Sequence, residues 1–146
     1  MKWMAGWRVG WAAGKSMGGG SSSFERKGEI LALRAEGEID THQTCEFIAR
    51  AKNLNESCKL PVRGLLVDLL HWEGVSPEAL DETYSFYEWC AEQGAVATAF
   101  VAPPDYFVRG SATRYEAVRR RMHLKWFEST AAAWAWFAEL GLALHP

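Results

Sequence analysis

Four side chains with catalytic chemistry fall near the expected carboxyl ends of strands: Asp40, Asp68, His71 and Ser76. Proteins with parallel sheets usually place ligand sites at these ends, and Ser, His and Asp are the groups that hydrolases combine. However, Ser76 lacks the G-x-S-x-G elbow of a nucleophile, and no Gly-rich turn supplies an oxyanion hole. We therefore predict no catalytic residues. Asp68 is expected to receive backbone N–H bonds at its strand end, and His71 to pack in a loop.

The sequence also predicts no metal or cofactor site. Neither the histidines nor the cysteines show the spacing of metal ligands, and the GxGxxG and Walker patterns of nucleotide-binding loops are absent. The three cysteines indicate a reducing cytoplasm rather than a disulfide framework. Cys45 and Cys90 lie in helical patterns, where we expect small buried hydrophobic side chains.

Composition indicates one globular domain. The 146 residues are 49% hydrophobic and 23% charged, with a net charge of -2. Residues 1–23 contain three basic residues and no acid, so the remainder, with 13 basic and 18 acidic residues, has a net charge of -5. This acidic balance argues against a nucleic-acid partner, because that binding depends on basic surface.

Residues 1–23 form a separate segment in which Trp3, Trp7 and Trp11 recur every fourth residue before a Gly/Ser-rich run. We interpret it as a flexible extension that is not native, with Met17 as the true start. The alternative is a short interfacial helix on anionic lipid. This is the only membrane contact we expect, because no apolar run approaches the ~20 residues of a membrane span.

The segment from Arg63 to Leu80 best indicates the fold class. An apolar run from Leu65 to Leu70 is typical of a strand buried on both faces, and a polar break at His71–Gly74 follows. A helix is then expected, with Ser76 as N-cap, proline at its first position and Glu78 in its first turn. A buried strand that leads into a helix marks a βα unit.

The other segments extend this pattern to ββαβαβαβα. This order predicts a single α/β domain over residues 24–141, with a mostly parallel central sheet and a short tail at 142–146. The expected strands are Phe24–Arg26, Glu29–Glu36, Val62–Leu70, Ala95–Ala102 and Leu124–Phe127. The expected helices are Thr41–Leu54 with Thr41 as its cap, Pro77–Gln93, Ser111–Met122, and a last one capped by Ser129 or Thr130 that ends at Leu140.

Five short motifs occur in a recognisable order: Gly37-Glu-Ile-Asp40, Leu65-Leu-Val-Asp68, Trp72-Glu-Gly74, Val101-Ala-Pro-Pro-Asp105 with Val108-Arg-Gly110, and Phe127 to Phe137. Together they resemble a STAS domain of the SpoIIAA-like branch, which is often grouped with the lipid-binding SEC14 fold. The likeness covers about residues 24–140. It implies the predicted fold and a role in binding other proteins, as in anti-sigma-factor antagonists.

The chain departs from this family at the start of the second helix. STAS antagonists have Asp-Ser-Ser-Gly-Leu there, and the first of those serines receives a phosphate. Ser76-Pro-Glu-Ala-Leu80 stands in its place, with Pro77 at the position of the phosphorylated serine. The kinase switch therefore cannot be carried over to that position. Phosphorylation of Ser76 is an alternative, although we expect a simple helix cap.

Two further features suggest contacts. The helix from Pro77 has an acidic face that includes Glu78, Asp81 and Glu82, and a later segment is rich in arginine. Arg109 and Arg114 in that segment are candidate anion-binding residues, and a solvated helix face is the simpler interpretation. The same acidic helix carries four crowded aromatic residues, which either fill the core or line a pocket for an apolar ligand.

The sequence therefore predicts a non-catalytic, cytoplasmic, STAS-like regulatory module that binds a protein partner or its own copy. The expected contact residues are His71, Trp72, Ser76, Glu78, Asp81 and Glu82. The alternative is a carrier of a lipid or other apolar small molecule in a pocket near the aromatic-rich helix.

Overall fold

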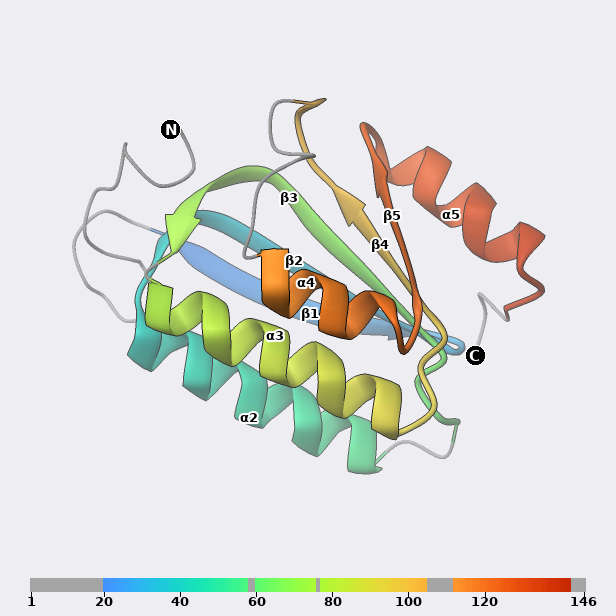
Figure 1. Cartoon of the computed structure of the whole chain (residues 1–146), viewed down its shortest axis with the longest axis horizontal. Coiled ribbons are helices and arrows are strands. Elements are labelled where there is room, and N and C mark those ends of the chain that lie inside the picture. Colours follow the sequence, from blue (N-terminus) through green and yellow to red (C-terminus); the bar gives the residue numbers. More distant parts are fainter. Residues whose placement is uncertain (1–19, 58–59, 76, 105–111, 143–146) are drawn as a thin grey trace.

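The computed structural model describes residues 20–57, 60–75, 77–104 and 112–142 (Figure 1). Its strands are β1 (Ser21–Lys27), β2 (Ile30–Ile39), β3 (Gly64–Val75), β4 (Ala97–Val101) and β5 (His123–Phe127). Its helices are α2 (Thr41–Ser57), α3 (Pro77–Glu92), α4 (Ala112–Arg119) and α5 (Thr130–Glu139). The predicted order ββαβαβαβα and the α/β class are confirmed.

The five strands lie in sequence order, β1-β2-β3-β4-β5. Strand β1 runs antiparallel to β2, and every other neighbouring pair is parallel. Each parallel connection steps to the next strand in one direction. Because such crossovers are right-handed, their helices must all lie on one face of the sheet. Accordingly α2, α3 and α4 lie side by side on one face, and α5 lies on the other (Figure 1).

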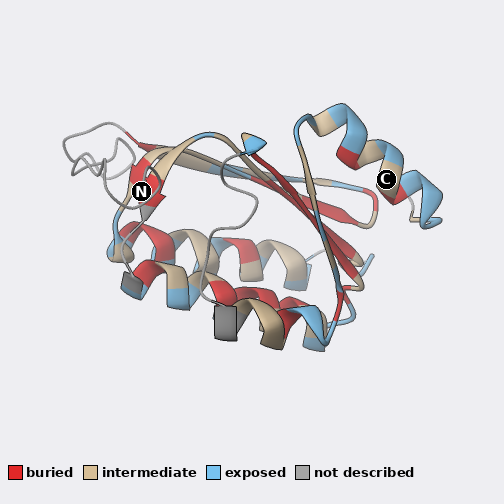
Figure 2. Ribbon diagram, turned by 45° about the horizontal axis from the view of Figure 1, so that its top comes forward, coloured by how far each residue is buried: buried red, intermediate tan, exposed pale blue. Residues whose placement is uncertain are grey.

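Two apolar clusters lie on the two faces of the sheet. The larger one joins the inner faces of α2, α3 and α4 to alternate residues of β2, β3 and β4, such as Leu33, Val67 and Phe100. The smaller one packs Ala133 and Phe137 of α5 on the opposite side chains of the same strands. Burial is therefore concentrated in the central strands and on the helix sides that face them (Figure 2).

Strand β3 is longer than predicted. The polar segment His71–Gly74 continues the strand instead of forming a loop, so the predicted loop position of His71 and Trp72 is wrong. The reason is the neighbouring strand: His71 lies beside Glu36 and Trp72 beside Gly37 in the ladder with β2. At each of the two register shifts in that ladder, β3 advances one residue more than β2, so β3 bulges while it keeps pairing. Gly37 of β2, between the two shifts, has a positive φ of 71°.

Both strands of the N-terminal hairpin exceed their predicted bounds. Strand β1 begins at Ser21 rather than Phe24, and Ser21 pairs with Glu36, so three residues that we assigned to the extension belong to the sheet. Strand β2 continues to Ile39 rather than Glu36. The extension before residue 20 and the tail after residue 142 lie outside the described residues.

Helix α2 is capped by Asp40, not by Thr41 as predicted. The Asp40 carboxylate accepts a hydrogen bond from the Gln43 backbone N–H at 2.7 Å. The Gln43 side-chain oxygen accepts one from the Asp40 N–H at 3.2 Å. This reciprocal pair is a capping box. The helix then extends to Ser57, three residues past the predicted Leu54, and its predicted apolar face is confirmed by the burial of Thr44 and Ala51.

Helix α3 matches its predicted bounds within one residue. Tyr84, Phe86, Tyr87 and Cys90 are buried on its inner face, so the expectation for Cys90 is confirmed. The expectation for Cys45 is wrong, because this residue lies on the solvent side of α2. A helix has a narrow apolar stripe, and helical spacing alone does not show on which side of it a single cysteine falls.

Helix α4 is shorter than predicted, because its regular part ends at Arg119, yet Val118 and Met122 are buried as expected. Strand β4 is shorter than predicted, and β5 begins one residue earlier. Helix α5 is capped as predicted by Ser129, whose side chain accepts the Ala132 N–H at 3.2 Å.

Candidate functional site

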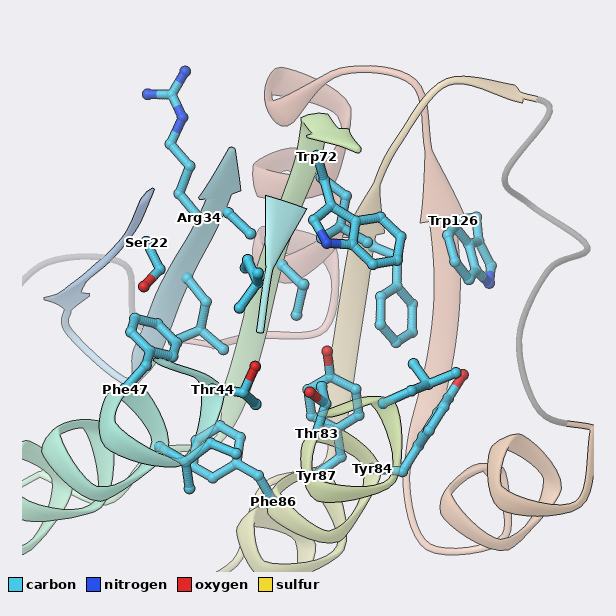
Figure 3. A pocket seen from close by; sticks show the side chains of 18 residues that line it. Ser22, Arg34, Thr44, Phe47, Trp72, Thr83, Tyr84, Phe86, Tyr87 and Trp126 are labelled. Carbon is cyan, nitrogen blue, oxygen red and sulfur yellow. The ribbon is translucent and has the colours of Figure 1, made fainter. Parts of the chain in front are cut away.

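The predicted contact residues lie where β3 leads into α3. His71 is exposed near the end of β3, whereas the Trp72 side chain is half-buried and turns toward the helices (Figure 3). Trp72 and Leu80 pack in one apolar cluster with Ala102. The end of β3 and the second turn of α3 are therefore held together by this packing.

Three acidic side chains lie on the solvent side of α3 beside that cluster. Glu78, Asp81 and Glu82 are all exposed, and Glu78 lies in the first turn, where a negative charge favours the helix dipole. We call these three residues the acidic surface. Ser76, predicted to cap this helix, lies outside the described residues, so both its capping role and its phosphorylation stay predictions.

The structure describes only part of the arginine-rich segment. Arg109 lies outside the described residues, and the side chain of Arg114, in α4, is not described. Farther along the chain, Arg121 pairs with Glu92 of α3 at 3.1 Å and Arg119 pairs with Glu116 at 2.9 Å. The two glutamates partly neutralise the charges of Arg119 and Arg121. The candidate anion site at Arg109 and Arg114 stays a prediction.

A cavity of about 120 Å³ lies between the sheet and the helices α2 and α3 (Figure 3). Its walls are mostly apolar, and seven of the lining side chains are aromatic. The 18 lining residues are Ser22, Leu33, Arg34, Ala35, Ile39, Thr44, Phe47, Ile48, Val67, Leu69, Trp72, Leu80, Thr83, Tyr84, Phe86, Tyr87, Phe100 and Trp126.

Ring packing shapes the walls of this cavity. Phe100 of β4 stacks on Trp126 of β5 with a centroid distance of 4.5 Å. Tyr87 of α3 meets the edge of Phe100 at 5.7 Å. Such offset and edge contacts stabilise rings beyond their buried area. The cavity is therefore bounded by rings that hold one another in place.

Few polar groups face this space. The hydroxyls of Thr44 and Thr83 donate to backbone carbonyls of their own helices, those of Asp40 at 3.0 Å and Ala79 at 2.8 Å. The Arg34 side chain extends away from the cavity toward Glu36 and Asp68 (Figure 3). The Tyr87 hydroxyl, by contrast, points into the cavity, and burial raises its pKa, so this group stays neutral.

Two of the four residues that suggested a hydrolase, Asp40 and Asp68, have structural roles here. Asp40 caps α2, and the Asp68 carboxylate accepts the Leu70 N–H at 3.1 Å, as predicted. Asp68 also lies 3.7 Å from Arg34. Within the described ranges, no group of three His, Cys, Asp or Glu side chains is arranged to hold a metal ion. None of the helices described has the length and apolar character needed to cross a membrane.

Sequence reasoning indicated the cavity only in part. The crowded aromatic residues of α3 pointed to a pocket, and Tyr84, Phe86 and Tyr87 do line it. It missed the contributions of Val67 and Trp126. The sequence shows that both side chains are apolar and lie in expected strands. Only the packing of several strands and helices shows that a space is left between them.

Comparisons with known proteins bear on the fold. No family model and no curated protein sequence matches the chain. Among solved structures, it resembles an uncharacterised protein of the DUF3478 family with a SpoIIAA-like fold from Shewanella loihica PV-4. That match has 15% identity and a TM-score of 0.57, and it covers 84% of this chain and 96% of that one.

The chain also resembles an anti-sigma factor antagonist from Mycobacterium paratuberculosis. This match has 18% identity and a TM-score of 0.52, and it covers 80% of this chain and 92% of that one. Both matches span most of the described domain, and both agree with the likeness that the sequence motifs predicted. The described residues therefore have a SpoIIAA-like fold.

Proposed function

We propose that this chain is a regulatory module that acts by binding another protein through the acidic surface. The observation that carries the proposal is the exposure of Glu78, Asp81 and Glu82 together on the first turns of α3. His71 is also exposed, near the end of the strand that leads into α3. The likeness to an anti-sigma factor antagonist supports a protein partner.

The chemistry of the surface specifies the kind of partner. Clustered carboxylates favour a basic protein surface and accelerate its encounter, and this attraction weakens as salt is added. A second copy of the chain is the other partner that the sequence predicts, because exposed Arg120 and its neighbours supply basic charge. We place the module in the cytoplasm and assign it no catalytic role.

Charge reversal tests this proposal. Glu78, Asp81 and Glu82 are changed together to Lys, and the matched control reverses three exposed acids elsewhere, Glu56, Glu128 and Glu139. Both variants change the net charge equally. We expect quantitative pull-down to recover a specific partner with the wild type and the control but not with the surface variant. A partner that binds the wild type, the surface variant and the control equally would refute binding through the acidic surface. Light scattering of the same three proteins measures self-association.

The cavity supports a second candidate function, the binding of a small apolar molecule. A concave apolar space with few polar groups is typical of ligand sites, and its size is close to that of an engineered cavity of about 150 Å³ that binds benzene. A lipid with long acyl chains exceeds this space, so the ligand we propose is smaller than the lipid considered from the sequence. The experiment described below tests this function together with the ligand class.

A further inference from the structure

Tyr87 places a hydroxyl in the wall of the cavity. The Tyr87 side chain is only 5% exposed, and its ring packs on Tyr84 and Phe100. Within the described part of the chain, its hydroxyl makes no hydrogen bond, and Figure 3 shows it directed into the cavity. Because this hydroxyl faces the cavity, an occupant that bonds to it is favoured over one that offers no polar group.

The other features of the site restrict this occupant. The two threonine hydroxyls already donate to backbone carbonyls. Buried water usually needs two to four polar partners, roughly, and beside Tyr87 the mostly apolar walls offer only the Ser22 hydroxyl of β1, so the space suits water poorly. A neutral hydroxyl both donates and accepts, which suits a neutral polar group on the ligand.

Size and shape point to a ring. A volume of about 120 Å³ matches a molecule of one six-membered ring. The aromatic side chains of Trp72, Phe86 and Trp126 line the same space and offer faces and edges to such a ring. The Arg34 guanidinium extends away from the cavity, so the ligand needs no negative charge.

We propose that this cavity binds a neutral single-ring molecule with one hydroxyl, of the phenol class, whose hydroxyl hydrogen-bonds to Tyr87. The ring lies among the aromatic walls, and its polar group replaces the partner that the protein does not provide. This inference rests on the second proposed function, small-molecule binding in the cavity. It adds the chemical class of the ligand and the residue that selects it.

The test compares phenol with toluene, which has the same ring and a methyl group in place of the hydroxyl. Both are titrated by calorimetry into the full chain, into Tyr87→Phe and into a matched control, Thr98→Val. Thr98 is fully buried and its hydroxyl donates to Met122 Sδ at 3.2 Å, so the control also removes a buried hydroxyl, but one outside the cavity lining. Two-dimensional NMR of labelled protein confirms that each ligand perturbs cavity residues.

We expect the wild type and Thr98→Val to bind phenol about fivefold more tightly than toluene, the effect of one hydrogen bond. Tyr87→Phe is expected to lose this preference and to bind toluene as well as before. Equal affinity for both ligands in the wild type, or an unchanged preference in Tyr87→Phe, would overturn the assignment of the phenol class and leave ligand binding intact. If neither molecule binds up to its solubility limit, both this inference and the small-molecule function are wrong.

Discussion

At the scale of residues, burial decides how the reactive side chains of this domain behave. Cys90 and Tyr87 lie one turn apart on the inner face of α3, and burial is the main cause that raises both pKa values. For Cys90 the pKa rises to about 12, although the nearby Lys52 partly opposes the shift. The thiol is therefore protonated at neutral pH and cannot act as a nucleophile.

This protection predicts a strong difference in cysteine labelling. In folded protein at pH 8, we expect iodoacetamide to modify Cys45, which is exposed, and to leave Cys90 unmodified. The two thiols fall in different tryptic peptides, so mass spectrometry separates them. In denaturant both should react at similar rates, which is the control. Labelling of Cys90 at the rate of Cys45 in the folded state would contradict the buried position.

The raised pKa of Cys90 also determines how the free energy of unfolding changes with pH. The unfolded chain ionises a thiol near its ordinary pKa of 9.0, whereas the folded chain keeps Cys90 protonated to about pH 12. Above pH 9, the unfolded state therefore binds fewer protons than the folded state. The free energy of unfolding is expected to fall as the pH rises through this interval.

At the scale of elements, helix ends and strand irregularities position the site. The capping box at Asp40 fixes the start of α2, directly after the end of β2, where β2 pairs with the bulged part of β3. From there the helix carries Thr44 and Phe47 to the cavity. The bulge lets β2 pair with the long β3, and this pairing brings Trp72 over the same space.

The capping box gives a prediction at this scale. Asp40→Ala removes the acceptor for the Gln43 N–H, and the free energy of unfolding is expected to fall by about 1 kcal/mol. For a chain of this length that change lowers the melting temperature by roughly 3 °C, which circular dichroism measures. Asp40→Asn keeps an acceptor and serves as the control. An alanine variant that melts with the wild type would show that the cap contributes nothing measurable.

At the scale of the whole molecule, two layers of helices enclose the sheet unequally. Three helices cover one face and contain the cavity, whereas α5 alone packs on the other face, where the cluster is tight. Gly64, at the start of β3, marks how close that packing is. A Cβ atom there would lie 2.7 Å from Ile30 Cδ1 and 3.2 Å from Phe137 Cε1.

Gly64→Ala is therefore expected to destabilise the domain through crowding between the sheet and α5. Such overpacking costs about 1–3 kcal/mol, because Ile30 and Phe137 are fully buried and have little room to move. The measurement is urea unfolding of Gly64→Ala, Ile30→Val and the double variant. Ile30→Val removes the nearest atom, so the double variant should lose less stability than the two single variants combined. Strict additivity would contradict crowding as the cause.

The sequence alone determined the class of the fold and the order of its elements. Apolar runs, helical spacing and caps such as Ser129 are local signals, because each depends on a few neighbouring residues. They predicted one α/β domain and located the buried side of α3. The motifs that follow the strands also indicated the SpoIIAA-like fold, which the structural matches confirm.

Only the tertiary structure decided what happens beyond these local signals. His71–Gly74 are polar, yet they form a strand because β2 offers backbone partners alongside them. The cavity depends on how side chains from several strands and helices fit together, and no stretch of sequence encodes a volume. That fit also turns the Tyr87 hydroxyl toward open space rather than toward a protein partner. Non-local pairing and packing complementarity, which link residues far apart in the chain, therefore define the candidate site.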